Sequence, residues 1–220
     1  MQKIKNIIFD LGGVIINIDY QLTVDAFRKL GIKNINEVFS QIKQTELFDL
    51  FETGKISSHE FRTTLLKYTS NTITTSEINN AWNAMLLDVP KERIKLLAEL
   101  NKYYNIVVLS NTNEIHIHEF ANILQQNHGF RDLSHLFKKV YYSYEIGYRK
   151  PNEDVFHFVL NDSGFIAHET LFIDDSLQHI QGANKIGIHT LHLKPELNIN
   201  QIFGESFSIK EEFISQMSTI

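Results

Sequence analysis

The chain has 220 residues, of which 43% are hydrophobic and 21% charged, a balance typical of a folded globular protein rather than a disordered one. It contains no cysteine, which excludes disulfides and thiolate metal sites. The formal net charge is −5 without a basic cluster, so nucleic acid is not an expected partner. No apolar stretch has the length of a membrane span or the form of a signal peptide, so we expect a cytoplasmic protein without a membrane partner.

Short apolar runs typical of buried strands recur along the chain, and helical patterns separate most of them. The predicted strands are residues 7–10, 106–110, 140–144, 171–174 and 188–193. Amphipathic segments near residues 113–127, 152–163 and 177–187 lie between the last four strands. This alternation predicts an α/β fold with a doubly wound parallel sheet of the Rossmann-like kind.

The interval from residue 20 to residue 86 differs, because it has a helical period and no convincing strand. Ser57 stands three residues before Glu60, and Thr74 three before Glu77, so both pairs predict capping boxes at helix starts. Glycines 31 and 54 fall where helices would end, and proline 90 where the next helix would begin. We therefore predict a small helical cap at 20–86, inserted into a core of 1–19 and 87–220 through hinges near 16–20 and 86–90.

Polar side chains stand at the ends of four of the predicted strands. In a doubly wound sheet, such positions converge on one edge. The set combines three carboxylates, a hydroxyl, an amide and an ammonium group. Its members are Asp10, Ser110, Asn111, Lys150, Asp174 and Asp175.

Three carboxylates at one edge require compensation, since two of them about 4 Å apart repel by roughly 4 kcal/mol at an effective dielectric of about 20. Oxygen ligands without His or Cys in the motifs favour Mg²⁺ as the cation. The hydroxyl of Ser110, the backbone N–H of Asn111 and the ammonium of Lys150 suit a phosphate group. These residues predict a phosphoryl-transfer site with a carboxylate nucleophile available.

Four segments resemble, in order, the motifs of the haloacid dehalogenase-like hydrolase superfamily. The resemblance covers nearly the whole chain, and the segment from Gln181 to Ile188 is similar to a subgroup. This subgroup contains bacterial sugar-1-phosphate phosphatases and the N-terminal phosphatase domain of epoxide hydrolases. The four segments are Asp10 with Gly12-Gly13-Val14, Leu109-Ser110-Asn111-Thr112-Asn113, Gly147-Tyr148-Arg149-Lys150-Pro151 and Phe172-Ile173-Asp174-Asp175.

The resemblance implies a Mg²⁺-dependent phosphatase that acts on a small phosphorylated metabolite. Asp10 would attack phosphorus and form an aspartyl-phosphate, while Ser110 and Lys150 would hold the phosphoryl oxygens. The metal ligands would be Asp10, the carbonyl of Gly12 and Asp175, with Asp174 helping directly or through water.

Gly12 departs from the family pattern, because the family has at this position a second aspartate that protonates the leaving group. General acid–base help typically contributes about 10²–10⁴ in rate. We therefore expect a substrate with a good leaving group, such as a sugar phosphorylated at its anomeric oxygen or an acyl phosphate. Gly12→Asp is expected to broaden the substrate range.

Two other functions compete with this interpretation. A metal-independent haloacid dehalogenase would also use Asp10, but it would have no need for the Asp174-Asp175 pair. A phosphometabolite-binding regulatory protein with little turnover is the other alternative, and Gly12 keeps it open.

Further polar residues are weaker candidates. His116 lies one turn into the helix after Ser110 and is a candidate for a substrate contact. Asn17, Asp19 and Tyr20 lie beside the predicted hinge and are candidates for the lining of the site. The sequence does not predict the oligomeric state.

Overall fold

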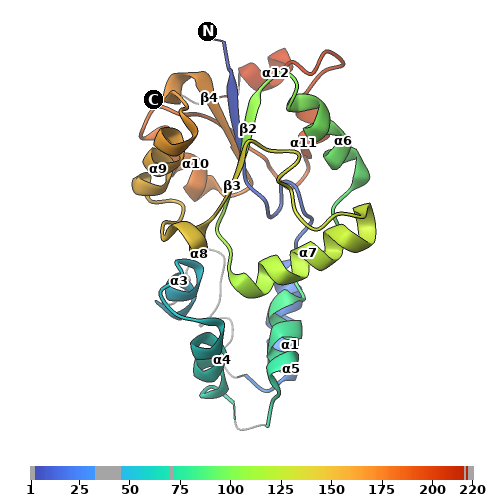
Figure 1. Ribbon diagram of the computed structural model, residues 1–220, viewed down its shortest axis with the longest axis vertical. Helices are drawn as coiled ribbons and strands as arrows, with labels where there is room; N and C mark the ends of the chain where they lie inside the picture. The colour runs from blue at the N-terminus through green and yellow to red at the C-terminus, as the bar shows by residue number, and fades with distance from the viewer. Residues whose placement is uncertain (1–2, 33–45, 70–71, 216, 218–220) are drawn as a thin grey trace.

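The computed structural model describes residues 3–32, 46–69, 72–215 and 217, which form an α/β fold (Figure 1). Five parallel strands make one sheet in the order β3-β2-β1-β4-β5. The chain places β2 and β3 on one side of β1 and then β4 and β5 on the other, which confirms the doubly wound prediction. The strands are β1 (Asn6–Phe9), β2 (Asn105–Ser110), β3 (Lys139–Tyr142), β4 (Thr170–Asp174) and β5 (His189–His192).

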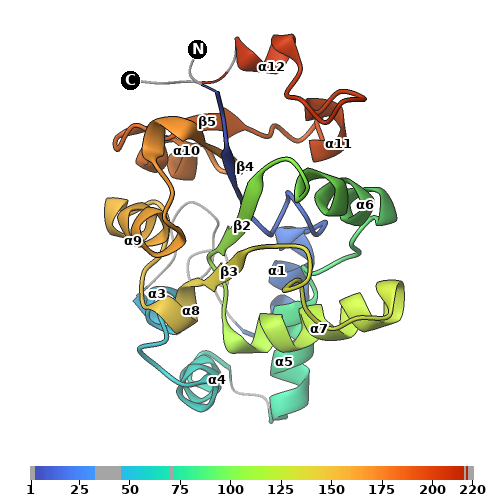
Figure 2. The ribbon, with the colours of Figure 1, turned by 45° about the horizontal axis from the view of Figure 1, so that its top comes forward.

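Helices cover both faces of the sheet (Figures 1 and 2). Ile7 and Phe9 of β1 pack into a cluster on one face, whereas Ile8 packs into a cluster on the other. The first cluster includes side chains of α6 (Lys91–Leu100), α7 (Glu114–His128), α11 (Ile199–Ile202) and α12 (Glu211–Ile214). The second includes side chains of α9 (Glu153–Ser163) and α10 (Leu177–Asn184). None of the described helices combines the length and apolar character needed to cross a bilayer.

A separate group of helices lies at the end of the molecule opposite the N-terminus (Figure 1). The rings of this group pack closely, since Phe48 lies 5.5 Å from Phe61 and 5.1 Å from Trp82 between ring centroids. All three side chains are buried, so the group has an apolar core of its own. Its members are α1 (Tyr20–Lys29), α3 (Glu46–Glu52), α4 (Ser58–Leu66) and α5 (Thr75–Asn83).

This helical group stands where the sequence predicted the cap. Both expected capping boxes are formed, at the starts of α4 and α5. Gly31 and Gly54 have φ values of 80° and 66°, as expected where helices end, and Pro90 precedes α6. Residues 33–45 and 70–71 of the predicted cap lie outside the described residues, and the boundaries at 20 and 86 stay a prediction.

The two chain segments that lead into and out of the helical group run side by side. The Asn17 N–H donates to the carbonyl of Asp88 at 2.9 Å, and the Asp19 N–H to the carbonyl of Met85 at 2.9 Å. Ile18 and Leu86 form an antiparallel bridge between them. The two segments predicted as hinges therefore pair with each other as one antiparallel ribbon.

All five predicted strands are present, but the end of the third is wrong. Strand β3 stops at Tyr142, and residues Ser143–Ile146 form the short helix α8. The Ser143 hydroxyl accepts the N–H of Thr112 at 2.9 Å and donates to its carbonyl at 3.0 Å. These bonds tie the start of α8 to the loop after β2.

The predicted helices near 113–127 and 152–163 are confirmed as α7 and α9. The third, near 177–187, ends earlier than expected, at Asn184 of α10. Gly187 follows with a φ of 80°, and the 3-10 turn η1 (Ala167–Glu169) precedes β4. Helices α11 and α12 were not predicted.

Candidate active site

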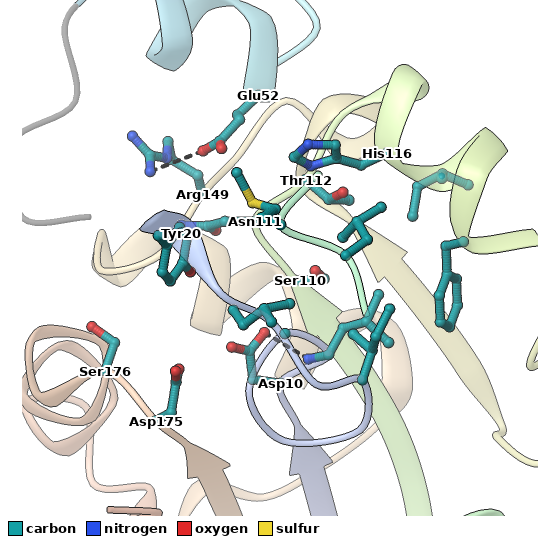
Figure 3. Close-up of a pocket in the computed structure, with 18 of the residues that line it drawn as sticks. Asp10, Tyr20, Glu52, Ser110, Asn111, Thr112, His116, Arg149, Asp175 and Ser176 are labelled. Atoms are coloured by element: carbon teal, nitrogen blue, oxygen red, sulfur yellow. Dashed lines mark hydrogen bonds and ion pairs between the residues drawn. The ribbon is translucent and has the colours of Figure 1, made fainter. Parts of the chain in front are cut away.

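The polar residues that the sequence placed at strand ends meet at the carboxyl edge of the sheet, below a pocket that faces the helical group (Figure 3). Asp10, Ser110 and Asp175 line the pocket, and Asn111 and Gly12 line it beside them. Lys150 and Asp174 are fully buried behind this surface.

Lys150 links two of the carboxylates. Its Nζ lies 2.7 Å from Oδ1 of Asp10 and 2.7 Å from Oδ2 of Asp174. The other oxygen of Asp174 accepts the N–H of Ser176 at 2.7 Å and lies 3.0 Å from Nδ1 of His179. The ammonium group is thus fixed against the side chain of Asp10 by a carboxylate that is itself held on two sides.

Burial and charge shift the titration of these groups. Burial, with the nearby charge of Asp174, raises the pKa of Asp10 to about 6, against the opposing effect of Lys150. Burial, with the charges of Asp10 and Asp174, raises the pKa of Asp175 to about 7. Burial would raise the pKa of Asp174, but Lys150 and His179 hold it below its usual range. Burial would lower the pKa of Lys150, but Asp10 and Asp174 raise it. The site therefore keeps Lys150 charged and has excess negative charge to neutralise.

Asn111 and Gly182 fix the backbone that carries Lys150. The Asn111 amide donates to the carbonyl of Lys150 at 2.8 Å and accepts its N–H at 2.9 Å. Gly182 of α10 packs against Pro151, the residue after Lys150. A Cβ at position 182 would lie 2.2 Å from the carbonyl oxygen of Pro151. The Asn111 side chain thus positions Lys150, while phosphate binding by its backbone N–H stays a prediction.

The oxygen donors at the pocket floor fit Mg²⁺. Burial and the neighbouring carboxylates raise the pKa values of Asp10 and Asp175, and a divalent cation would stabilise the ionised form of both. The carboxylate of Asp175 packs on Gly13, which has a φ of 74°. A Cβ at Gly13 would lie 2.4 Å from Oδ2 of Asp175. Donor atoms of Asp10, Asp174 and His179 also lie within 4.8 Å of one another. Because Lys150, Ser176 and His179 already engage the oxygens of Asp174, we regard Asp175 as the better direct ligand.

The space beside Gly12 is filled by an apolar side chain. A Cβ at position 12 would lie 3.1 Å from Cδ1 of Ile18, which belongs to the ribbon that joins the helical group to the core. Ile18 also lines the pocket. Among the described residues, the side chain nearest to a Cβ at position 12 is therefore apolar, where the family has its second aspartate.

The pocket has two walls that the sequence did not reveal. One is polar and contains Tyr20, Glu52 of α3 and Arg149 (Figure 3). Of these, Tyr20 alone was a candidate, from its place beside the hinge; Arg149 adjoins Lys150, but Glu52 carried no signal. The other wall is apolar and consists of Ile16, Ile18, Met85, Leu86, Ile117 and Phe120.

Other candidates have different environments. His116 lines the pocket, but its Nε2 lies 3.1 Å from the carbonyl of Trp82 and its Nδ1 lies 3.2 Å from the amide of Asn113. Burial lowers the pKa of His116 to about 4, so the ring is neutral near neutral pH. Asn17 pairs with Asp88 at 2.9 Å, and neither Asn17 nor Asp19 lines the pocket.

The fold and the site together define a class of hydrolase. A doubly wound sheet presents an aspartate after its first strand, a serine at the end of the second, a lysine and a pair of aspartates, all at one edge. The model of the haloacid dehalogenase-like hydrolase family matches residues 4–187, and the chain belongs to this family.

Several well-covered relatives share the fold. The chain is 35% identical over 187 residues to the D-ribitol-5-phosphate phosphatase of Bacteroides thetaiotaomicron, a match that covers 85% of this chain and 90% of the relative. A HAD family enzyme of the same organism, solved in complex with magnesium and inorganic phosphate, is 35% identical with a TM-score of 0.82. That match covers 91% of this chain and all of the other. A HAD-like family hydrolase of Porphyromonas gingivalis is 34% identical with a TM-score of 0.81, over 90% of this chain and 96% of the other.

Proposed function

We propose that the protein is a Mg²⁺-dependent phosphatase that hydrolyses the phosphate monoester of a small metabolite, either a sugar or a sugar alcohol. The observation that carries the proposal is the fixed contact between Lys150 and Asp10 beside the pocket, at 2.7 Å. The named relative acts on a sugar-alcohol phosphate, and a similar structure holds magnesium and phosphate. Both comparisons support a substrate that carries a phosphoryl group.

Asp10 is the proposed nucleophile. One of its oxygens bonds to phosphorus, the bond from phosphorus to the ester oxygen breaks, and an aspartyl-phosphate results. Water then hydrolyses this intermediate and releases phosphate. Lys150 holds Asp10 in place and, with Ser110 and the backbone N–H of Asn111, binds the phosphoryl oxygens.

The proposed metal ligands are Asp10, the carbonyl of Gly12 and Asp175, with Asp174 in support. Bound Mg²⁺ would neutralise charge on the carboxylates and on the phosphoryl oxygens. Asp174 has a second task in this proposal, since it fixes Lys150 at 2.7 Å.

The leaving group decides how much the absence of an acid at Gly12 costs. A substrate with an acidic leaving group needs little protonation, which favours anomeric sugar phosphates and acyl phosphates. The named relative instead cleaves the phosphate ester of a primary alcohol. Both kinds of substrate therefore belong in the first panel, and a good leaving group stays a prediction.

We further propose that residues 20–86 act as a cap over a catalytic core of 1–19 and 87–220. We also propose that the protein acts in the cytoplasm. The separate aromatic core of α1, α3, α4 and α5 supports this division. Closure of such a cap would exclude water from the pocket.

The test is phosphate release from a panel of phosphomonoesters, with Mg²⁺ and after its removal by a chelator. We expect release that depends on Mg²⁺ and is lost in Asp10→Asn, which keeps the shape of the side chain but removes the nucleophile. Halide release from a 2-haloacid without metal would instead identify a dehalogenase. Phosphate-ester binding without turnover would identify a regulatory protein.

A further inference from the structure

An ion pair forms part of the pocket wall that α3 contributes (Figure 3). Glu52 is 6% exposed, and its Oε2 lies 3.0 Å from Nη2 of Arg149. Arg149 directly precedes Lys150, and it also pairs with Asp49, one turn earlier on α3. Glu52 and Arg149 line the pocket, whereas Asp49 does not, and its side chain is half exposed.

Stability alone does not explain a buried ion pair in this position. Such a pair often contributes no more than apolar side chains of similar size, because both charges lose their hydration. In addition, Nε of Arg149 is buried without a hydrogen-bond partner among the described residues. Polar groups of a bound molecule are a natural complement to a charged wall of this kind.

We propose that Glu52 and Arg149 bind the hydroxyl groups of the substrate and make the enzyme selective for phosphorylated polyols over apolar phosphate esters. A carboxylate accepts hydrogen bonds from hydroxyl groups, and a guanidinium donates them to hydroxyl oxygens. The inference rests on the proposed function, because phosphoryl transfer to Asp10 fixes one end of the substrate.

Tyr20 connects the two ends of this site. In the view of Figure 3 it lies between Asp10 and the pair of Glu52 and Arg149. Burial and the carboxylates of Asp175, Asp10 and Glu52 raise the pKa of Tyr20 well above its usual value, so the phenol keeps its proton. A hydroxylated chain that extends from the phosphoryl group would pass a hydrogen-bond donor before it reaches Glu52.

A purely mechanical role for the pair makes a different prediction. The contacts from Arg149 to Asp49 and Glu52 also join α3 to the loop that carries Lys150. If they only held α3 in place, loss of either carboxylate would affect all substrates alike. Asp49→Asn is therefore the matched control for Glu52→Gln, since each removes one carboxylate from Arg149 and only Glu52 faces the pocket.

The experiment compares D-ribitol 5-phosphate, the substrate type named for the relative, with n-pentyl phosphate, which has the same chain length and no hydroxyl groups. The ratio of kcat/KM for the two substrates is measured in the wild type, Glu52→Gln and Asp49→Asn. Because both substrates are assayed on one preparation, the ratio does not depend on the folded fraction.

We expect the wild type to prefer the hydroxylated substrate. Glu52→Gln should lower that preference by about ten- to a hundredfold, the range for losing a hydrogen bond to a charged group, mainly through KM. Asp49→Asn should leave the ratio unchanged, because Asp49 does not line the pocket and its loss affects both substrates alike.

A wild-type ratio near one, or an equal loss for both substrates in Glu52→Gln, would overturn the inference and leave a mechanical contact. Phenyl phosphate with Mg²⁺ tests the proposed function separately. If phosphate is released from none of the three esters, the phosphatase proposal fails as a whole. If phenyl phosphate is cleaved and the ratio is insensitive to Glu52, only the selectivity fails.

Discussion

Gly12 and Ile18 together determine what stands near the leaving group. A carboxylate at position 12 would need the space that Cδ1 of Ile18 now fills, 3.1 Å from the place of a Cβ. Gly12→Asp alone would therefore press on the end of a flexible side chain that also lines the pocket. A second substitution at Ile18 makes room for the carboxylate without requiring that side chain to move.

We predict that Gly12→Asp combined with Ile18→Ala raises kcat/KM for n-alkyl phosphates at least about tenfold over Ile18→Ala alone, because a general acid contributes about 10²–10⁴. Activity on phenyl phosphate should change much less, since its leaving group is already acidic. The slope of log kcat/KM against leaving-group pKa measures this directly. An unchanged slope in the double variant would show that a carboxylate at position 12 gives no protonation.

Lys150 is the second residue whose effect can be isolated. Lys150→Met leaves Asp10 and Asp174 buried without their cation, and breaking a buried ion pair typically costs about 3–5 kcal/mol. The matched control is Lys139→Met, which removes a partner 2.7 Å from Asp162 at an exposed site and should cost about 0–1 kcal/mol. Urea unfolding without metal measures both, and equal costs would contradict the role we assign to Lys150.

The loop that carries Lys150 depends on neighbouring elements for its position. Asn111, at the end of β2, holds its backbone with two hydrogen bonds, and α10 packs on it through Gly182. Both contacts are made to the main chain of Lys150 and Pro151, so the position of the ammonium group depends on how the end of β2 and helix α10 meet this loop.

We predict that Gly182→Ala lowers kcat, because a Cβ 2.2 Å from the Pro151 carbonyl oxygen must displace the loop that carries Lys150. Overpacking of this kind should also lower the free energy of unfolding by about 1–3 kcal/mol. Gly204→Ala is the control, since a Cβ there would have 3.8 Å to its nearest neighbour and no positive φ opposes it. A Gly182→Ala enzyme with wild-type kcat would show that the loop accommodates the methyl group without moving Lys150.

Residues at strand ends are marked by local sequence patterns, whereas contacts between distant parts of the chain are not. Apolar strands ending in polar residues predicted that Asp10, Ser110, Asp174 and Asp175 would lie at one sheet edge, because the topology alone brings strand ends together. Their roles in the site stay a prediction. Helix α8 was missed because Ser143 is held by a residue far away in the chain. No local pattern marks such a contact.

The pocket walls were missed for the same reason. Glu52 lies on an amphipathic helix where a carboxylate is ordinary, and only its burial against Arg149 across the molecule distinguishes it. Ile18 likewise has the appearance of any apolar residue beside a hinge. It matters for the site because its side chain fills the space that Gly12, without a side chain, leaves open.

The whole molecule combines a rigid sheet edge with a helical group joined through one paired ribbon. Bonds between Asn17 and Asp88 and between Asp19 and Met85 tie the two connections together, so both would move as a unit. Ile18 on this ribbon packs at Gly12, so a movement of the helical group would shift the Ile18 side chain near Asp10. If the helical group closes over the pocket as we propose, its closure would therefore also change the packing beside Gly12.

Metal binding and pH should act together on the stability of the whole chain. The pKa values of Asp10 and Asp175, about 6 and about 7, lie above the ordinary value of 3.8. Between about pH 4 and pH 7 the folded protein therefore holds protons that the unfolded chain has released. His116, whose pKa falls from 6.5 to about 4, acts in the opposite direction between about pH 4 and pH 6.5, but it is one group against two. The free energy of unfolding of the metal-free protein should therefore still fall as pH rises through this window.

Mg²⁺ should reverse this trend, because it binds the ionised carboxylates and competes with their protons. At pH 8 and about a hundred times its Kd, we expect Mg²⁺ to raise Tm by roughly 5–10 °C, from a stabilisation of about 2.7 kcal/mol. At pH 5 the same concentration should have a much smaller effect, since Asp10 and Asp175 are then largely protonated. Thermal unfolding at both pH values, with Mg²⁺ and with a chelator, measures the difference, and Asp175→Asn should remove most of the response. Equal shifts at the two pH values would mean that the stabilising cation binds away from these carboxylates.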